Sequence, residues 1–204
     1  AQTMIDGYDQ KGARFRYLFS RLRETACAIV ENIADEMAVS DFRPIAFELG
    51  FGGKDGQLPA ITVTEGSTAL SVRGKVDRVD GWIKDGKLYL RVVDYKTGSK
   101  LFREEDLKDG HNLQMFLYMK ALCACREENF LKGIGAEKGE QTQSAGVVYQ
   151  IVSEPSVKAE KWLGAAEAQE KLRTGIKRSG LLIDDKKVLE AMYRGGSSVF
   201  SPRK

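Results

Sequence analysis

The fold of this chain is decided by the stretch Val92-Val93-Asp94-Tyr95-Lys96-Thr97-Gly98, which ends a strand predicted over 88–96. Side chains of a strand alternate between its two faces, so Asp94 and Lys96 point the same way. Apolar residues on both faces indicate a central strand. Because burial makes a carboxylate and an ammonium costly at such a place, the pair indicates a function rather than a structural role.

An Asp-Gly turn joins this strand to the preceding one, predicted over 68–83. Counted outward from the turn at Asp85-Gly86, Asp77 lies eight residues before it and Asp94 eight residues after it. Cross-strand neighbours in a hairpin lie side by side. A simple hairpin therefore brings the two carboxylates together at one end.

Two neighbouring carboxylates repel each other unless a cation lies between them. Mg²⁺ suits two aspartates whose shell is completed by waters and a phosphate oxygen. Lys96 would face the same cavity, where its charge stabilises a developing phosphate charge or positions the attacking water. These residues predict metal-assisted phosphodiester hydrolysis. From the residues alone, the alternative is a structural Asp/Lys ion network at the end of a hairpin.

The rest of the chain mixes helical and strand patterns. Steps of three or four between apolar residues predict a long amphipathic helix over 12–39, and its arginines form either a solvated face or a phosphate-contacting patch (Arg14, Arg16, Arg21 and Arg23). Further helices are predicted over 109–127, 158–177 and 184–194, with Gly180 as a cap between the last two. Further strands are predicted over 42–52, 61–64 and 145–153, and Gly74 suggests a bulge or a close backbone approach within 68–83.

Composition is typical of one globular domain. The chain has 204 residues, 42% of them hydrophobic and 30% charged. Its net charge of +3 neither requires nor opposes nucleic acid. We find no apolar run of about 18 residues and no signal peptide. Because Cys27, Cys123 and Cys125 lack metal-binding spacing, they predict reduced thiols in a cytoplasmic protein.

Three short motifs resemble a known family. They are Gly74-Lys75-Val76-Asp77-Arg78-Val79-Asp80, Val93-Asp94-Tyr95-Lys96-Thr97-Gly98 and Gln114-x-x-x-Tyr118. In this order they resemble the GxxD, DYK and QxxxY hallmarks of RecB-type nucleases of the PD-(D/E)XK superfamily. The resemblance is closest to the C-terminal nuclease domain of the AddB family, which is one of the two chains of bacterial ATP-dependent helicase/deoxyribonucleases. It runs from about residue 42 to about residue 152.

The resemblance implies a fold and a metal site. The fold would be a restriction-endonuclease-like α/β core, a mixed sheet flanked by helices. Asp77 and Asp94 would be the metal-binding acids, with the Tyr95 backbone carbonyl completing the metal shell. Lys96 would be the catalytic lysine, and Glu48 occupies an acidic position of the preceding strand whose role is left open between a surface salt bridge and the metal site.

The resemblance also implies contacts with DNA. Gln114 and Tyr118 would line the site from a helix and steer the DNA strand. Strand parity puts Asp80 on the face opposite Asp77, which favours structural support over metal ligation. Candidates for phosphate contact are Lys75, Arg78, Lys100 and Arg103.

The chain departs from the family pattern in two ways. The family carries a histidine on a helix well before the core, whereas the only histidine here is His111, which bears on metal affinity and on the activity of this chain alone. The family also carries four cysteines for a [4Fe–4S] cluster, and those of this chain do not match their positions. No GxxxxGK[ST] loop is present to bind ATP.

The resemblance thus implies one nuclease domain over 1–204, a fragment of a larger protein. It would comprise an N-terminal helix (1–40), a catalytic core (41–152) and C-terminal helices (153–204). It would cleave single-stranded DNA with Mg²⁺ or Mn²⁺, beside a helicase-nuclease partner (the A subunit), for recombinational repair of double-strand breaks. The alternatives are a nuclease-fold module that handles DNA or docks subunits without cutting, and a sibling enzyme such as a resolvase or restriction nuclease.

Overall fold

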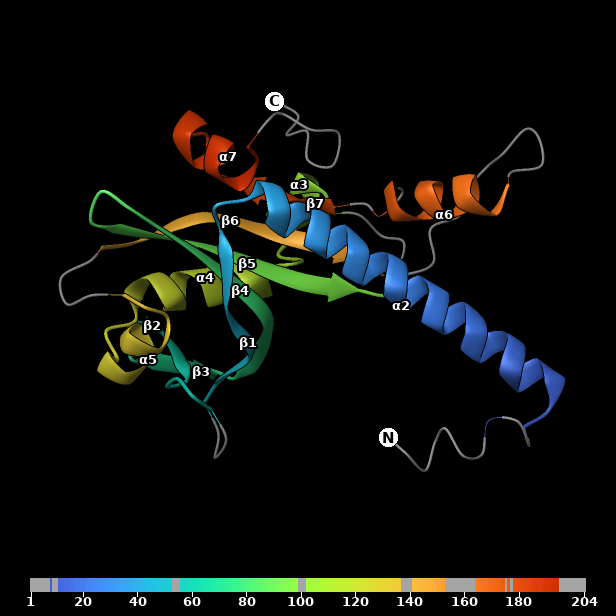
Figure 1. Ribbon diagram of the computed structural model, residues 1–204. Coiled ribbons are helices and arrows are strands. Elements are labelled where there is room, and N and C mark those ends of the chain that lie inside the picture. The colour runs from blue at the N-terminus through green and yellow to red at the C-terminus, as the bar shows by residue number, and fades with distance from the viewer. Residues whose placement is uncertain are drawn as a thin grey trace.

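A five-stranded mixed sheet forms the centre of the molecule (Figure 1). The computed structural model describes residues 8, 11–52, 56–98, 102–136, 141–152, 164–174, 176 and 178–194. The strand order is β1-β4-β5-β6-β7. These strands are Arg43–Phe51, Gly74–Lys84, Lys87–Lys96, Gln141–Ile151 and Arg178–Leu182. Only β5 and β6 are parallel; the other neighbours are antiparallel, which confirms the predicted mixed α/β fold.

The hairpin between β4 and β5 has the predicted geometry. Asp85 and Gly86 have φ values of 51° and 71°, as a two-residue type I′ turn requires at both central positions. The ladder runs from Lys84 opposite Lys87 to Arg78 opposite Val93, so it ends immediately beside the two aspartates. β5 lies between β4 and β6, so the prediction of a central strand is confirmed.

Helices cover both faces of the sheet (Figure 1). On one side lie α4 (Gln114–Ala124) and the short α5 (Glu128–Gly133), and on the other side lie α2 (Ala13–Val39) and α7 (Lys186–Met192). The remaining helices are α3 (Glu104–Lys108) and α6 (Ala165–Thr174), which packs against α2. None of the helices in the described part of the chain is long and apolar enough to cross a membrane.

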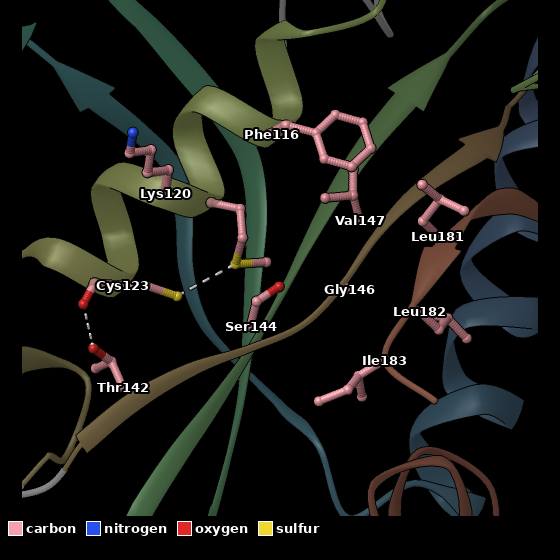
Figure 2. A pocket seen from close by; sticks show the side chains of 11 residues that line it. Phe116, Lys120, Cys123, Thr142, Ser144, Gly146, Val147, Leu181, Leu182 and Ile183 are labelled. Carbon is pink, nitrogen blue, oxygen red and sulfur yellow. Dashed lines mark hydrogen bonds between the residues drawn. The ribbon is translucent and has the colours of Figure 1, made fainter. Parts of the chain in front are cut away.

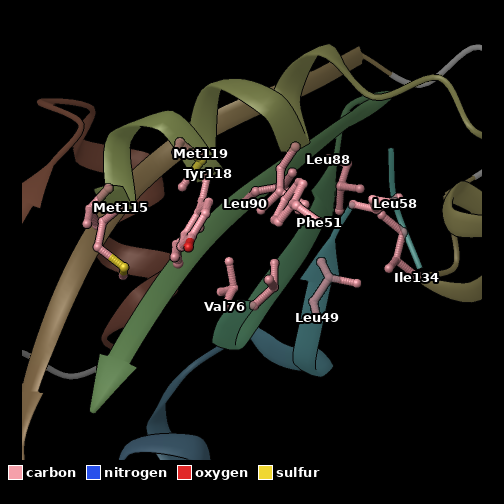
Figure 3. Close-up of a cluster of buried hydrophobic side chains, with 14 of the residues drawn as sticks. Leu49, Phe51, Leu58, Val76, Leu88, Leu90, Met115, Tyr118, Met119 and Ile134 are labelled. Carbon is pink, nitrogen blue, oxygen red and sulfur yellow. The ribbon is translucent and has the colours of Figure 1, made fainter. Parts of the chain in front are cut away.

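Two apolar clusters flank the sheet. The larger one lies between the sheet and α4, where Met115, Tyr118 and Met119 point from the helix toward Leu90 of β5 (Figure 3). The smaller one joins α7 to the opposite face through Phe42 and Met192, with Trp82 and Tyr89 packed against it. Both faces of β5 are thus covered, which explains why its strand pattern is apolar on both sides.

The predicted strand over 68–83 is wrong in one respect, since it is two strands in two sheets. β3 (Thr68–Val72) pairs with β2 (Ile61–Glu65) in a separate two-stranded sheet, while β4 starts at Gly74. A side chain at Gly74 would overlap the Tyr118 hydroxyl of α4. Of the two predicted explanations for Gly74, the structure shows the close approach, here between the strand backbone and a helix.

The predicted helix over 109–127 also needs correction, because α4 begins only at Gln114. Gly110 and Asn112 have φ values of 78° and 60°, which ends helical geometry before the motif. Leu113, whose helical spacing to Leu117 would predict burial, is 44% exposed, and Met115, Tyr118 and Met119 lie on the buried face. Leu113 is the N-cap residue of α4 and precedes its first turn, so it lies outside the buried face of the helix.

Gly180 is not a helix cap. It lies inside β7, where a side chain would overlap the Val147 carbonyl of β6, so the glycine permits close strand pairing. β6 begins at Gln141, four residues before the predicted start at residue 145. Of the predicted helix over 158–177, residues 158–163, 175 and 177 lie outside the described residues, and α6 accounts for 165–174.

α2 buries a polar face rather than its apolar stripe. Its fully buried residues are Ala28, Asn32 and Glu36, whereas Leu18 and Leu22 in its N-terminal half are 55% and 66% exposed. That half projects beyond the sheet in Figure 1. The arginines of this half lie on the exposed part of the helix or at its border, as predicted. The amphipathic helix is confirmed, but its contact with the sheet is electrostatic.

A buried ion cluster joins α2 to the sheet. Asp80 accepts hydrogen bonds from Arg78 Nη2 and Arg91 Nη2 at 3.2 and 2.7 Å, and all three side chains are 0–1% exposed. Glu36 lies 2.7 Å from Arg91 Nη2 and 3.1 Å from Arg178 Nη2. The prediction that Asp80 gives structural support on the face opposite the active site agrees with these contacts.

Candidate active site

The two predicted metal-binding aspartates lie at the end of the β4–β5 hairpin. Asp77 Oδ2 accepts a hydrogen bond of 2.8 Å from the Tyr95 backbone N–H. Asp94, the residue before Tyr95 on β5, is close enough to Asp77 for their charges to interact. The hairpin register deduced from the Asp-Gly turn therefore brings the two carboxylates together, although the whole hairpin separates them along the chain.

Lys96 lies against Asp94. Its Nζ is 2.6 Å from Asp94 Oδ2, and the two side chains are 45% and 15% exposed. Burial raises the pKa of the Asp94 carboxyl, Lys96 opposes this shift, and the charge of Asp77 adds to it. Because the ionised form of Asp94 is disfavoured in this way, a further cation beside it would stabilise that form.

The donor set fits a hard divalent cation. Two carboxylates and a backbone carbonyl offer only oxygen ligands, which Mg²⁺ prefers together with several waters. In the part of the chain that the structure describes, no group of three or more His, Cys, Asp or Glu side chains is placed to hold a metal. The oxygens that could hold Mg²⁺ here are those of Asp77, Asp94 and the Tyr95 carbonyl, with water and substrate completing its shell.

Glu48 lies across from Asp77 on β1 but pairs with another side chain. Its neighbours Phe47 and Leu49 pair with Arg78 and Val76, so the register places Glu48 opposite Asp77. Glu48 Oε2 lies 2.8 Å from Lys75 Nζ, and both side chains are more than half exposed. Hydrogen bonding to Glu48 raises the pKa of Lys75, with a smaller contribution from Asp77. Of the two predicted roles, the structure shows the surface salt bridge.

Gln114 and Tyr118 form a hydrogen-bonded pair on α4. Gln114 Nε2 donates to the Tyr118 hydroxyl at 2.7 Å. Tyr118 is 1% exposed and stacks on Phe51, with ring centroids 5.3 Å apart, so its ring packs in the core. Its role toward DNA stays a prediction. Gln114 is exposed and is the member of the pair that faces solvent.

Comparison with known proteins agrees with this geometry. A family model described as the PD-(D/E)XK nuclease superfamily matches residues 2–195. The chain belongs to the PD-(D/E)XK nuclease superfamily. Its five-stranded mixed sheet is thus a restriction-endonuclease-like core, and the predictions of family, fold and nuclease enzyme are confirmed.

Curated relatives of this nuclease are named as the B subunit of an ATP-dependent helicase/deoxyribonuclease. Those of Natranaerobius thermophilus and Clostridium acetobutylicum are 35% and 30% identical over 184 and 193 residues. The alignments cover 89% and 93% of this chain but 15% and 16% of those proteins. The chain therefore spans about a sixth of the length of the curated relatives it matches.

The basic residues predicted to contact phosphate differ in their exposure to solvent. Arg78 was predicted to contact phosphate, but it is 1% exposed and donates to the Tyr95 hydroxyl at 2.9 Å, so that prediction is wrong. Lys75 and Arg103 are exposed and accessible to a backbone phosphate. Lys100 lies outside the described residues. The sequence alone could not distinguish a buried arginine from an exposed one, because β4 carries charged residues on both of its faces.

Tyr149 of β6 lies at the site, although the sequence analysis did not predict it as a site residue. The parallel register pairs it with Asp94, and its ring centroid lies 5.7 Å from Lys96 Nζ. Burial, followed by the charge of Asp94, raises the pKa of Tyr149 to about 12, so the phenol stays protonated. The only signal in the sequence is a tyrosine within an otherwise apolar strand, and the partner strand could not be deduced from it.

An apolar groove of about 550 Å³ lies along the sheet, away from these side chains (Figure 2). Phe116 and Lys120 of α4 face Val147 of β6 and Leu181 of β7 across it. Thr142 donates to the Cys123 carbonyl at its edge, and all three cysteines of the chain are free, as predicted. None of the catalytic candidates lines this groove.

Gly74→Ala should destabilise the nuclease by about 1–3 kcal/mol, because the new methyl group overlaps the Tyr118 hydroxyl and overpacks the core. Urea unfolding measures this difference. Gly133→Ala is the matched control, since no atom lies within 4 Å of its added Cβ. Equal stability of the two variants would contradict the close packing of Gly74 against α4.

Proposed function

We propose that this chain is the deoxyribonuclease domain of a bacterial helicase-nuclease complex, and that it hydrolyses phosphodiester bonds of single-stranded DNA with Mg²⁺. The observation that carries the proposal is the meeting of Asp77, Asp94 and Lys96 at one strand end. Two acids and a lysine suit metal-assisted phosphoryl chemistry. Their arrangement around one exposed point gives a phosphate access from solvent.

The residues divide the chemistry among them. A bound Mg²⁺ would polarise the phosphate and lower the pKa of an attacking water. Asp77 and Asp94 would hold that ion, and the Asp77 contact to the Tyr95 N–H orients the carboxylate and the adjoining carbonyl. Lys96 is 45% exposed, and its ammonium would stabilise the charge that develops on the phosphate.

The proposed substrate and partner follow from the relatives' names and from the surface. Relatives named as helicase/deoxyribonuclease subunits suggest a helicase-nuclease partner, the A subunit, in a cytoplasmic complex for recombinational repair of double-strand breaks. This chain has no phosphate-binding loop for ATP, so the ATP-dependent step would reside elsewhere. A helicase delivers single strands, and exposed Lys75 and Arg103 suit backbone contacts that carry no base readout. The [4Fe–4S] cluster of the family would likewise lie outside this chain.

Cleavage assays on labelled single-stranded, duplex and branched DNA test the proposal. With Mg²⁺ or Mn²⁺, the chain and the complex that carries it should degrade single strands fastest, and EDTA should stop the reaction. Preferential cutting of branched or duplex DNA would instead indicate a resolvase or restriction nuclease. Binding without any cleavage at saturating Mn²⁺, in chain and complex alike, would support the non-cleaving DNA-handling or docking module.

A further inference from the structure

Tyr149 connects the active-site strand to the turn that precedes α4, the helix that carries Gln114. Its side chain is 5% exposed, and Lys96 Nζ lies over its ring, 5.7 Å from the centroid. We propose that Tyr149 is a positioning residue that holds the Lys96 ammonium in the active site. The inference rests on the proposed function only in taking Lys96 as the catalytic lysine.

Two contacts fix the ring of Tyr149, and one of its partners is itself held in place. The ring stacks on Phe102, with centroids 5.6 Å apart and planes at 11°. Its hydroxyl donates to the Asn112 carbonyl at 3.3 Å, in the turn that precedes α4. Phe102 is held in turn by its N–H, which donates to Ser179 Oγ of β7 at 2.8 Å. Lysine has a flexible four-carbon stem, whereas this ring is held from β6, β7 and the turn, so the ring can order the lysine.

A neutral ring holds the lysine differently from a carboxylate. Asp94 contacts Lys96 at 2.6 Å, but a carboxylate that also binds a cation shares its charge and attracts the ammonium less. The face of an aromatic ring attracts an ammonium without competing for the metal. The raised pKa of the phenol keeps Tyr149 in this neutral form at the pH of the assay. The ring would therefore retain Lys96 when Asp94 is engaged.

Lysine-methyl NMR tests the contact without any catalysis. Reductive methylation with ¹³C labels each lysine and keeps its charge, and Lys96→Arg assigns the Lys96 signal. In wild type this signal should be shifted upfield by the ring current, with and without Mg²⁺. Tyr149→Phe should keep the shift, and Tyr149→Leu should remove it. Tyr89→Leu is the matched control, because it truncates a ring of the strand that carries Lys96 but packs in the smaller cluster on the opposite face, so it should leave the Lys96 shift in place.

Cleavage kinetics then separate positioning from folding. Tyr149→Leu should lower kcat roughly fivefold with little change in KM, as expected for a lost cation–π contact to a partly exposed lysine. Tyr149→Phe should retain kcat within about twofold, since the ring remains. An unshifted Lys96 signal in wild type, or equal kcat in Tyr149→Leu and Tyr89→Leu, would overturn the inference. Loss of all cleavage in wild type with a shifted Lys96 signal would instead overturn the proposed function alone.

Discussion

Asp94→Ala should lower the rate of single-strand cleavage by on the order of 10³-fold. The substitution removes a carboxylate that would bind the metal and that contacts Lys96 at 2.6 Å. Metal ions supply several kcal/mol of transition-state stabilisation, and a loss of about 4 kcal/mol corresponds to this factor. Initial rates on labelled single strands at saturating Mn²⁺ measure it, in wild type and variant complexes prepared alike.

The fold should survive this substitution. Burial disfavours the ionised form of Asp94, which raises its pKa, so the carboxylate is not what stabilises the strand end. Thermal unfolding of Asp94→Ala should therefore stay within a few degrees of wild type, about 1 kcal/mol or less. Asp109→Ala is the matched control, because Asp109 is exposed at the end of α3 and should leave the rate unchanged. Equal rates in wild type and Asp94→Ala would end the catalytic interpretation.

The sequence predicted the part of the site that depends on local geometry. An Asp-Gly turn with both residues at positive φ fixes the register of its two strands, and that register alone brings Asp77 to Asp94. Lys96 then follows from the two-residue period of a strand. The other contacts described for the site could not be predicted in this way, because they join elements that are distant from one another in the sequence.

The parts that could not be predicted come from long-range pairing. The parallel pairing of β5 with β6 places Tyr149 beside Asp94, but nothing in either strand encodes which residue of one faces which of the other. β7 is a short segment in which two leucines follow Gly180, and its role as an edge strand depends on the backbone of β6. Tyr118 had the spacing of a site residue, yet its ring packs on Phe51 of β1, which is distant from it in the sequence.

Buried charges were the hardest feature to predict. Glu36 lies on a helix whose sequence shows an apolar stripe elsewhere, and only the structure brings it to arginines of β4, β5 and β7. Within this cluster, Arg78 also donates to the Tyr95 hydroxyl, and the Tyr95 backbone in turn holds Asp77. The ion cluster therefore lies one residue away from the active site and supports the strand end that carries it.

Glu36→Gln should destabilise the nuclease by about 3–5 kcal/mol near pH 7, because it leaves buried arginines with one carboxylate in place of two. Glu36 is 2% exposed, so water cannot compensate for its lost charge. Urea unfolding gives the difference. Glu31→Gln on the exposed face of the same helix is the matched control and should change stability by less than about 0.5 kcal/mol.

The pH dependence distinguishes lost charge from lost packing. Burial opposes ionisation of Glu36, but Arg91, Arg178 and Arg78 together outweigh it and lower its pKa below the usual 4.5. A lowered pKa stabilises the folded state above the unfolded value of 4.5, and this stabilisation is lost as the pH falls through the folded value. The difference in the free energy of unfolding between wild type and Glu36→Gln should therefore be largest near pH 7 and decrease below pH 4.5. If that difference stays constant down to acid pH, Glu36 stabilises the fold through packing and not through its charge. The cluster would then support the active-site strand without the charge of Glu36.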